Sequence, residues 1–200
     1  PTATIETVEI DPAVVRVATD FFDYRSDEKN LIVTEDARVY GKRAKIRGLR
    51  YDLIILDAFN GDYIPEHLMT MEYLQEMREL LTPDGTLVAN TFSSSNLYHH
   101  ESNSYREVFG DVIHYRRKDT GNRVVLIPQA QRDGDARTRL TKEQLMARAQ
   151  ELDTDLRPYG VPIIRIAREV AAARRARPDW NLRKRPLSDQ YSPANLLRKP

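Results

Sequence analysis

Short apolar runs with strand-like composition alternate with helix-like patterns through residues 4–109. Runs rich in β-branched and aliphatic residues occupy four stretches, at residues 4–10, 31–34, 51–57 and 86–92. Apolar residues recur at helical spacing in residues 14–22 and 69–81, and residues 101–109 also have a helical pattern. This alternation predicts a mostly parallel sheet covered by helices. The run at 51–57 is expected to be buried on both faces.

Two further strands are predicted at residues 112–116 and 123–127, and the turn-forming residues between them indicate an antiparallel hairpin. A mostly parallel sheet that ends in such a hairpin resembles the class I methyltransferase fold, a Rossmann-like α/β architecture. In open α/β sheets the ligand usually lies over a Gly-rich first turn. The eight glycines of this chain form no GxG pattern. We therefore expect that the fold lacks its first strand and Gly-rich loop, which would lie upstream of Pro1.

Charge is spread unevenly along the chain. Residues 1–131 carry 15 Lys and Arg against 21 Asp and Glu, whereas residues 132–200 carry 16 against 9. We predict an α/β domain over residues 1–131, and a basic helical extension with a tail over residues 132–200, in which Trp180 belongs to a solvated helix end. The basic extension either packs on the acidic domain or faces anionic lipid. Aromatic residues are not interleaved with the basic ones, so no nucleic-acid partner is expected.

Composition also limits metal sites and location. With no cysteine and four scattered histidines, the chain shows no metal-ligand spacing, and we expect no metal. No stretch approaches the ~20 apolar residues of a membrane helix. These features predict a soluble piece in the cytoplasm. Because a missing strand would expose unpaired sheet edges, we also expect partnering, such as a homodimer.

Three acidic residues stand at the ends of predicted strands. Glu9 ends the first, where a carboxylate can accept hydrogen bonds from both ribose hydroxyls. Asp36 follows the second, where it can accept from an adenine amino group. Asp57 closes the run at 51–57, and a carboxylate at the mouth of a buried strand is partly desolvated, as is typical of a general base. Each has an ordinary alternative role, as a helix cap or a turn residue.

The same segments carry a family resemblance. Five motifs occur in the order and spacing of spermidine synthases: VEIDP from residue 8, EDAR from 35, YDLIILD from 51, PEHLMT from 65 and LTPDGTL from 81. Over about residues 4–128 the chain is similar to the spermidine synthase (polyamine aminopropyltransferase) family. It looks closest to bacterial spermidine synthase-like domains that are fused to membrane transporter-like segments. This resemblance implies an upstream membrane segment in the full-length protein.

The resemblance further implies transfer of an aminopropyl group from decarboxylated S-adenosylmethionine to a polyamine such as putrescine. Glu9 then binds the donor's ribose, Asp36 with the adjoining Ala37 binds the adenine, and Asp57 removes a proton from the attacking amine. The donor is a co-substrate, so no tightly bound cofactor is expected.

The acceptor site departs from the family pattern. Spermidine synthases usually have a second aspartate three residues after the catalytic one, and Asn60 stands there in this chain. A neutral amide holds a dication less well than a carboxylate does, so Asp62 or Glu101 could take over this role. Tyr105 could line the acceptor pocket. The predicted acceptor-binding residues are Asn60, Asp62, Glu101 and Tyr105.

Two other functions fit the same fold. An S-adenosylmethionine-dependent methyltransferase would use the carboxylated donor, whose carboxylate a Gly-rich loop normally holds. A non-catalytic nucleoside-binding or scaffold module of a membrane protein is favoured by Asn60 and disfavoured by the acidic set of Glu9, Asp36 and Asp57. The sequence leaves both open beside aminopropyl transfer.

Overall fold

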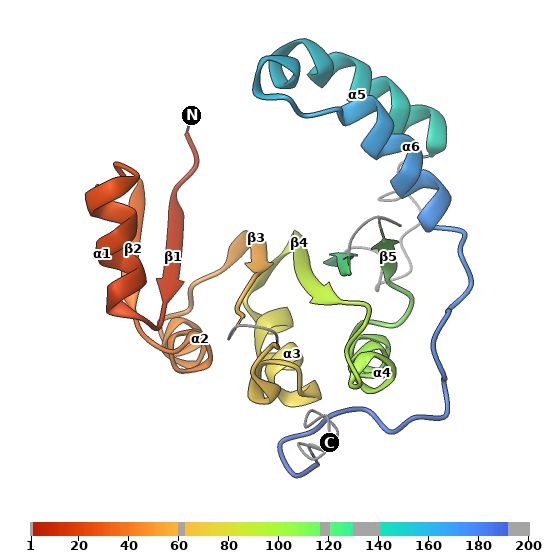
Figure 1. The fold of residues 1–200 in the computed structure, drawn as a ribbon, viewed down its shortest axis with the longest axis horizontal. Helices are drawn as coiled ribbons and strands as arrows, with labels where there is room; N and C mark the ends of the chain where they lie inside the picture. The colour runs from red at the N-terminus through yellow and green to blue at the C-terminus, as the bar shows by residue number, and fades with distance from the viewer. Residues whose placement is uncertain (1, 60–62, 117–120, 130–140, 192–200) are drawn as a thin grey trace. The chain divides into compact units, whose positions relative to one another are not determined.

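The computed structural model describes residues 2–59, 63–116, 121–129 and 141–191 (Figure 1). Contacts within the chain divide it into two compact units, residues 1–50 and residues 51–200. The domain boundary predicted after residue 131 falls in a stretch outside the described residues, and it stays a prediction.

The first unit is a small βαβα arrangement. Strands β1 (Ile5–Glu9) and β2 (Asn30–Thr34) pair in parallel, from Ile5 opposite Asn30 to Glu9 opposite Thr34. Helices α1 (Pro12–Phe21) and α2 (Ala37–Ile46) each begin shortly after a strand ends. The parallel pair and its crossover helix confirm the strand–helix alternation predicted for this part of the chain.

The second unit contains a four-stranded sheet in the order β3-β4-β6-β5. Strand β3 (Tyr51–Leu56) runs parallel to β4 (Leu81–Phe92), whereas β6 (Asn122–Pro128) runs antiparallel to both β4 and β5 (Ile113–Arg116). The predicted antiparallel hairpin is therefore confirmed, and it forms one side of this sheet. The parallel pair β3 and β4 brings two carboxyl ends to the same edge.

Strand β3 is less buried than expected. Leu53 is 53% exposed and Ile55 is 63% exposed, whereas Ile54 and Leu56 on the opposite face are partly buried. The prediction of burial on both faces is wrong for the described chain. In the second unit β3 is an edge strand with β4 as its neighbour, and the face that carries Leu53 and Ile55 remains exposed.

Helix α3 (Met71–Glu79) is shorter than the predicted helix at 69–81. The Thr70 hydroxyl accepts a hydrogen bond from the backbone N–H three residues later and so fixes the start of the helix. Leu81, expected to lie in this helix, instead begins β4 opposite Tyr51. Gly85 permits this close pairing, because a Cβ at that position would stand 2.9 Å from the Tyr51 carbonyl oxygen.

The helix predicted at residues 101–109 is also present, as α4 (Tyr98–Phe109). Helix η1 (Glu66–Leu68) precedes α3, and α4 packs beside α3 (Figure 1). The extension contains α5 (Lys142–Leu156), η4 (Arg157–Tyr159) and α6 (Ile163–Ala173), and α6 contacts β5. The predicted helical extension is confirmed. None of the helices in the described ranges is long and apolar enough to cross a membrane.

Residues 178–191, named the strap below, run from the end of α6 along α4 to the start of α3 (Figure 1). Trp180 is only 9% exposed, packs against the tilted His114 ring at a centroid distance of 4.3 Å and donates a hydrogen bond to the Asn103 side chain. Leu187 is fully buried against Met69 and Leu97. The prediction that Trp180 lies at a solvated helix end is therefore wrong.

Candidate functional site

The first unit places two acidic side chains at one edge of its sheet. Glu9 ends β1, and its Oε1 accepts a hydrogen bond of 2.8 Å from the backbone N–H of Asp11. Asp36 follows β2, and its Oδ1 accepts from the N–H groups of Arg38 and Val39 at 2.9 and 3.0 Å. The carboxyl ends of parallel strands meet at one edge, so both acids belong to the edge where α/β folds bind nucleosides.

Asp36 is the N-cap of α2, which is one of the alternatives that the sequence left open. Ala37 is the first residue of that helix and is half-buried, as are Glu9 and Asp36. Asp11, not Glu9, caps α1, since its side chain accepts from the N–H of Ala13. A cap carboxylate held by backbone N–H groups is fixed in direction, which suits a ligand-binding role equally well.

In the second unit, Asp57 directly follows β3 and stands beside Asn90 of β4. The Asn90 side chain donates from Nδ2 to Asp57 Oδ1 at 2.9 Å. Asn122, the first residue of β6, donates from its own Nδ2 to Asn90 Oδ1 at 3.0 Å. The rings of Phe59 and Phe92 pack at a centroid distance of 4.9 Å, two residues after Asp57 and Asn90. Asp57 is exposed, so the desolvation expected from a buried strand is not observed.

The predicted acceptor residues occupy different environments. Asn60 and Asp62 lie outside the described residues. Glu101 and Tyr105 lie on α4, and only 1% and 2% of their surfaces are exposed. Both are therefore interior residues of the second unit, and their contact with an acceptor stays a prediction.

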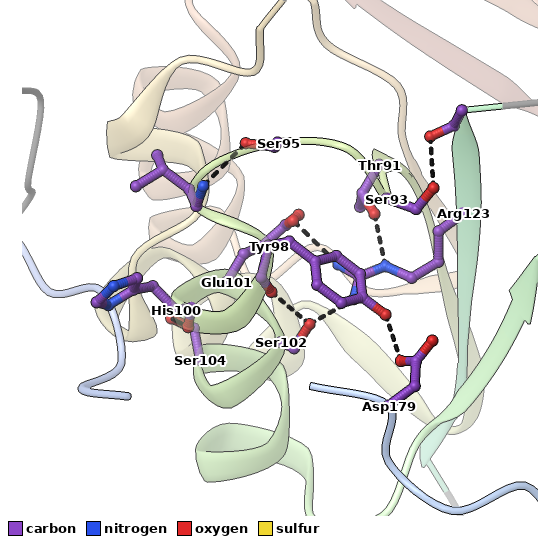
Figure 2. Close-up of polar contacts among 12 residues, drawn as sticks. Thr91, Ser93, Ser95, Tyr98, His100, Glu101, Ser102, Ser104, Arg123 and Asp179 are labelled. Atoms are coloured by element: carbon purple, nitrogen blue, oxygen red, sulfur yellow. Dashed lines mark hydrogen bonds and ion pairs between the residues drawn. The ribbon is translucent and has the colours of Figure 1, made fainter. Parts of the chain in front are cut away.

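Glu101 belongs to a buried cluster around Arg123 of β6 (Figure 2). The Arg123 guanidinium is fully buried and donates to Glu101 Oε2 at 3.0 Å, to Thr91 Oγ1 at 2.8 Å and to Ser102 Oγ. The Tyr98 ring lies 4.5 Å from the guanidinium carbon and adds a cation–π contact. Every arm of this cation therefore has a partner, as a buried charge requires.

Burial raises the pKa of Glu101 to about 7, against the attraction of Arg123, which lowers it. Its second oxygen, Oε1, has no hydrogen-bond partner among the described residues. Burial, followed by the nearby Glu101 charge, also raises the pKa of Tyr105 well above its usual value. The cluster continues outward through Tyr98, whose hydroxyl donates to Asp179 of the strap (Figure 2). Arg116 pairs with the same aspartate.

Arg123 was not among the residues singled out from the sequence. The signal that could have found it is the alternation of side chains along the strand. Arg123, Val125 and Ile127 are two residues apart and all point to the buried face of β6. An arginine on an inward-facing register position requires a buried partner, and the sequence does not reveal that Glu101 supplies it. Within the described ranges, no three His, Asp or Glu side chains are grouped so as to hold a metal ion.

Comparison with known proteins decides the family. Residues 2–144 match the spermine/spermidine synthase domain. The chain belongs to the spermine/spermidine synthase family. A polyamine aminopropyltransferase of Vibrio vulnificus is 43% identical over 200 residues, which cover 99% of this chain and 63% of that relative. The chain thus spans less than two thirds of the length of that relative.

Solved structures agree with the family's fold. Human methyltransferase-like protein 13, solved in complex with SAH, has a TM-score of 0.65 at 19% identity and covers 98% of this chain and 79% of its own. A probable spermidine synthase from Corynebacterium glutamicum has a TM-score of 0.54 at 23% identity and covers 87% of this chain and 63% of its own. These likenesses confirm the methyltransferase-like α/β fold of this chain.

Proposed function

We propose that this chain transfers an aminopropyl group from decarboxylated S-adenosylmethionine to a polyamine such as putrescine. The observation that carries the proposal is the carboxylate of Asp57, which stands exposed at the carboxyl end of β3 and is held by Asn90. Two facts support it: membership of the spermine/spermidine synthase family, and 43% identity to a polyamine aminopropyltransferase.

The reaction is a direct displacement. The acceptor's amine nitrogen forms a bond to the aminopropyl carbon next to the sulfonium, the carbon–sulfur bond breaks, and methylthioadenosine leaves with the electron pair. An ammonium has no lone pair for this attack, so Asp57 takes a proton from the acceptor. Most of the remaining acceleration comes from aligning the two substrates. The sulfonium sulfur leaves as a neutral thioether and needs no further activation. The proposal therefore includes no tightly bound cofactor.

The proposed adenosine site consists of Glu9, which accepts from the ribose hydroxyls, and of Asp36 with Ala37, which contact the adenine. Their place at the ends of β1 and β2 supports this assignment. The proposed acceptor-binding residues remain Asn60, Asp62, Glu101 and Tyr105. For Glu101, the unpartnered Oε1 supports a role toward an ammonium group, although reaching it requires the acceptor to pass beneath the surface of α4.

Location and assembly form part of the same proposal. The cysteine-free composition supports a reducing, cytoplasmic location. The exposed apolar face of β3, which carries Leu53 and Ile55, supports partnering of the chain, for example with a second copy.

The test begins with isothermal titration of the protein with methylthioadenosine, S-adenosylmethionine and decarboxylated S-adenosylmethionine. We expect methylthioadenosine to bind, Glu9→Ala to abolish this binding, and Asp20→Ala to leave it unchanged. Asp20 is an exposed acid of the same unit, located on α1 rather than at a strand end, and so serves as the matched control.

A turnover assay with decarboxylated S-adenosylmethionine and putrescine follows. We expect spermidine as a product, and loss of at least about 100-fold in kcat for Asp57→Asn, the usual scale of a general base. Absence of binding by all three adenosyl ligands would refute the adenosine site. Methylation of an acceptor by S-adenosylmethionine, without aminopropyl transfer, would replace the proposal with a methyltransferase.

A further inference from the structure

We propose that Asn90 and Asn122 are positioning residues, which form a directional hydrogen-bonded relay that sets the orientation of the Asp57 carboxylate. The inference rests on the proposed function, in which Asp57 accepts a proton from the acceptor amine. It adds two residues from two further strands to that site.

The direction of the relay follows from the chemistry of its members. A carboxylate can only accept hydrogen bonds, so Asn90 must turn its Nδ2 toward Asp57 Oδ1, at 2.9 Å. That orientation points Asn90 Oδ1 the other way, where it can only accept. Asn122 supplies the donor, with its Nδ2 at 3.0 Å. Only one assignment of donors and acceptors satisfies both hydrogen bonds: Asn122 donates to Asn90, and Asn90 donates to Asp57.

Strand pairing brings the three residues together. Leu56 pairs with Ala89 in the parallel register of β3 and β4, which places the next residues, Asp57 and Asn90, side by side. In the antiparallel register of β4 and β6, Asn90 lies opposite Val124, so Asn122 is its diagonal neighbour on the same face. The relay is therefore built on the sheet rather than on a loop, which limits the movement of its side chains.

A neutral amide is well suited to orienting a base. A cationic donor in the place of Asn90 would stabilise the charged carboxylate strongly and make it a poorer proton acceptor. Asn90 occupies Oδ1 without adding charge, and Asp57 Oδ2 has no hydrogen-bond partner among the described residues. The geometry assigns Oδ2 as the oxygen that receives the proton.

The relay makes an unusual prediction for Asn122. Asn122→Ala removes the donor to Asn90 Oδ1 and leaves the Asn90 amide held, among the described residues, by Asp57 alone. Asn122→Asp keeps the shape of the side chain, but its carboxylate can only accept, so it draws Asn90 Nδ2 toward itself and turns Asn90 Oδ1 toward Asp57. The more conservative substitution is then the more damaging one.

The first measurement compares kcat and KM for aminopropyl transfer in the wild-type protein and three variants. We expect Asn90→Leu to lower kcat by about tenfold or more, with the KM for the adenosyl donor within about twofold of wild type. We expect Asn122→Asp to lower kcat further than Asn122→Ala does. If Asn90→Leu keeps kcat within about twofold of wild type, or if Asn122→Asp is the milder of the two, the relay is overturned.

A second measurement does not depend on activity. In the amide NMR spectrum of the protein, we expect the Asn90 side-chain NH₂ resonance to shift in both Asp57→Ala and Asn122→Asp, and to stay in place in Asp20→Ala. If the Asn90 side-chain resonance does not shift in Asp57→Ala, the relay is refuted, whatever the result of the turnover assay. A wild-type protein that shows this coupling but transfers no aminopropyl group keeps the relay and refutes the proposed function instead.

Discussion

Replacing Arg123 by methionine tests the energetics of the buried cluster beneath α4. The substitution keeps much of the side-chain volume but removes the guanidinium and its hydrogen bonds to Glu101, Thr91 and Ser102. Glu101, 1% exposed, is then a buried carboxylate without a cation. Loss of one partner from a buried ion pair costs about 3–5 kcal/mol, and we expect the free energy of unfolding to fall by this amount at pH 8.5.

The loss depends on pH, and its sign follows from the pKa of Glu101. Burial raises that pKa from 4.5 to about 7 in the folded protein even with Arg123 present, so Arg123→Met raises it further. A carboxyl whose folded pKa lies above its unfolded value stabilises the fold most when it is protonated, and this contribution is lost as pH rises through the folded pKa. We therefore expect Arg123→Met to be less destabilised at pH 5.5 than at pH 8.5. For wild type, about 1.5 pH units lie between pH 5.5 and the folded pKa of about 7, which corresponds to roughly 2 kcal/mol across this window.

The assay is urea unfolding at pH 5.5, 7 and 8.5, followed by the fluorescence of Trp180, the single tryptophan. The double variant Arg123→Met with Glu101→Gln, which removes both charges, should recover about 2 kcal/mol relative to Arg123→Met at pH 8.5. Arg148→Met, which breaks a pair whose side chains are 63% exposed, is the control and should change stability by less than about 1 kcal/mol. A pH-independent loss, or a double variant no more stable than Arg123→Met, would refute the reasoning.

Two further predictions concern packing. Gly85→Ala should lower the free energy of unfolding by about 1–3 kcal/mol in urea titrations, because its Cβ would stand 2.9 Å from the Tyr51 carbonyl oxygen; an unchanged midpoint would contradict the pairing of β3 with β4. Trp180→Ala should lower the free energy of unfolding, followed by circular dichroism, by about 3–5 kcal/mol. It should also increase hydrogen exchange in the strap and on the facing side of α4. Unchanged exchange there would mean that Trp180 does not hold the strap.

The sequence predicted the parts of the fold that depend on local pattern. Strand composition predicted the positions of β1 to β4. The turn-forming residues between the last two predicted strands indicated the hairpin of β5 and β6. Asp36 was recognisable as a cap candidate because capping needs only one side chain and the next few N–H groups. The end of α3 was missed, since the pairing of Leu81 with Tyr51 depends on a contact between segments 30 residues apart.

What the sequence could not provide is which distant residues meet. Asp57 was identified from its place after an apolar run, but Asn90 and Asn122 become its neighbours only through the registers of three strands. Arg123 was passed over because arginine is seldom fully buried. Its burial depends on the partner that α4 supplies, and no local pattern encodes that pairing.

The contacts of the strap have a consequence for how the chain is made. His100 and Ser104 on α4 bond to the backbone of Arg185 and Leu187, which follow 85 and 83 residues later. At a synthesis rate of about 5–20 residues per second, roughly 4–17 seconds separate the emergence of this helix from the arrival of its cover. For that interval the face of α4 that carries His100 and Ser104 lacks the cover that the strap gives it in the folded chain. We expect its serine, asparagine and histidine side chains to bond to water until the strap arrives.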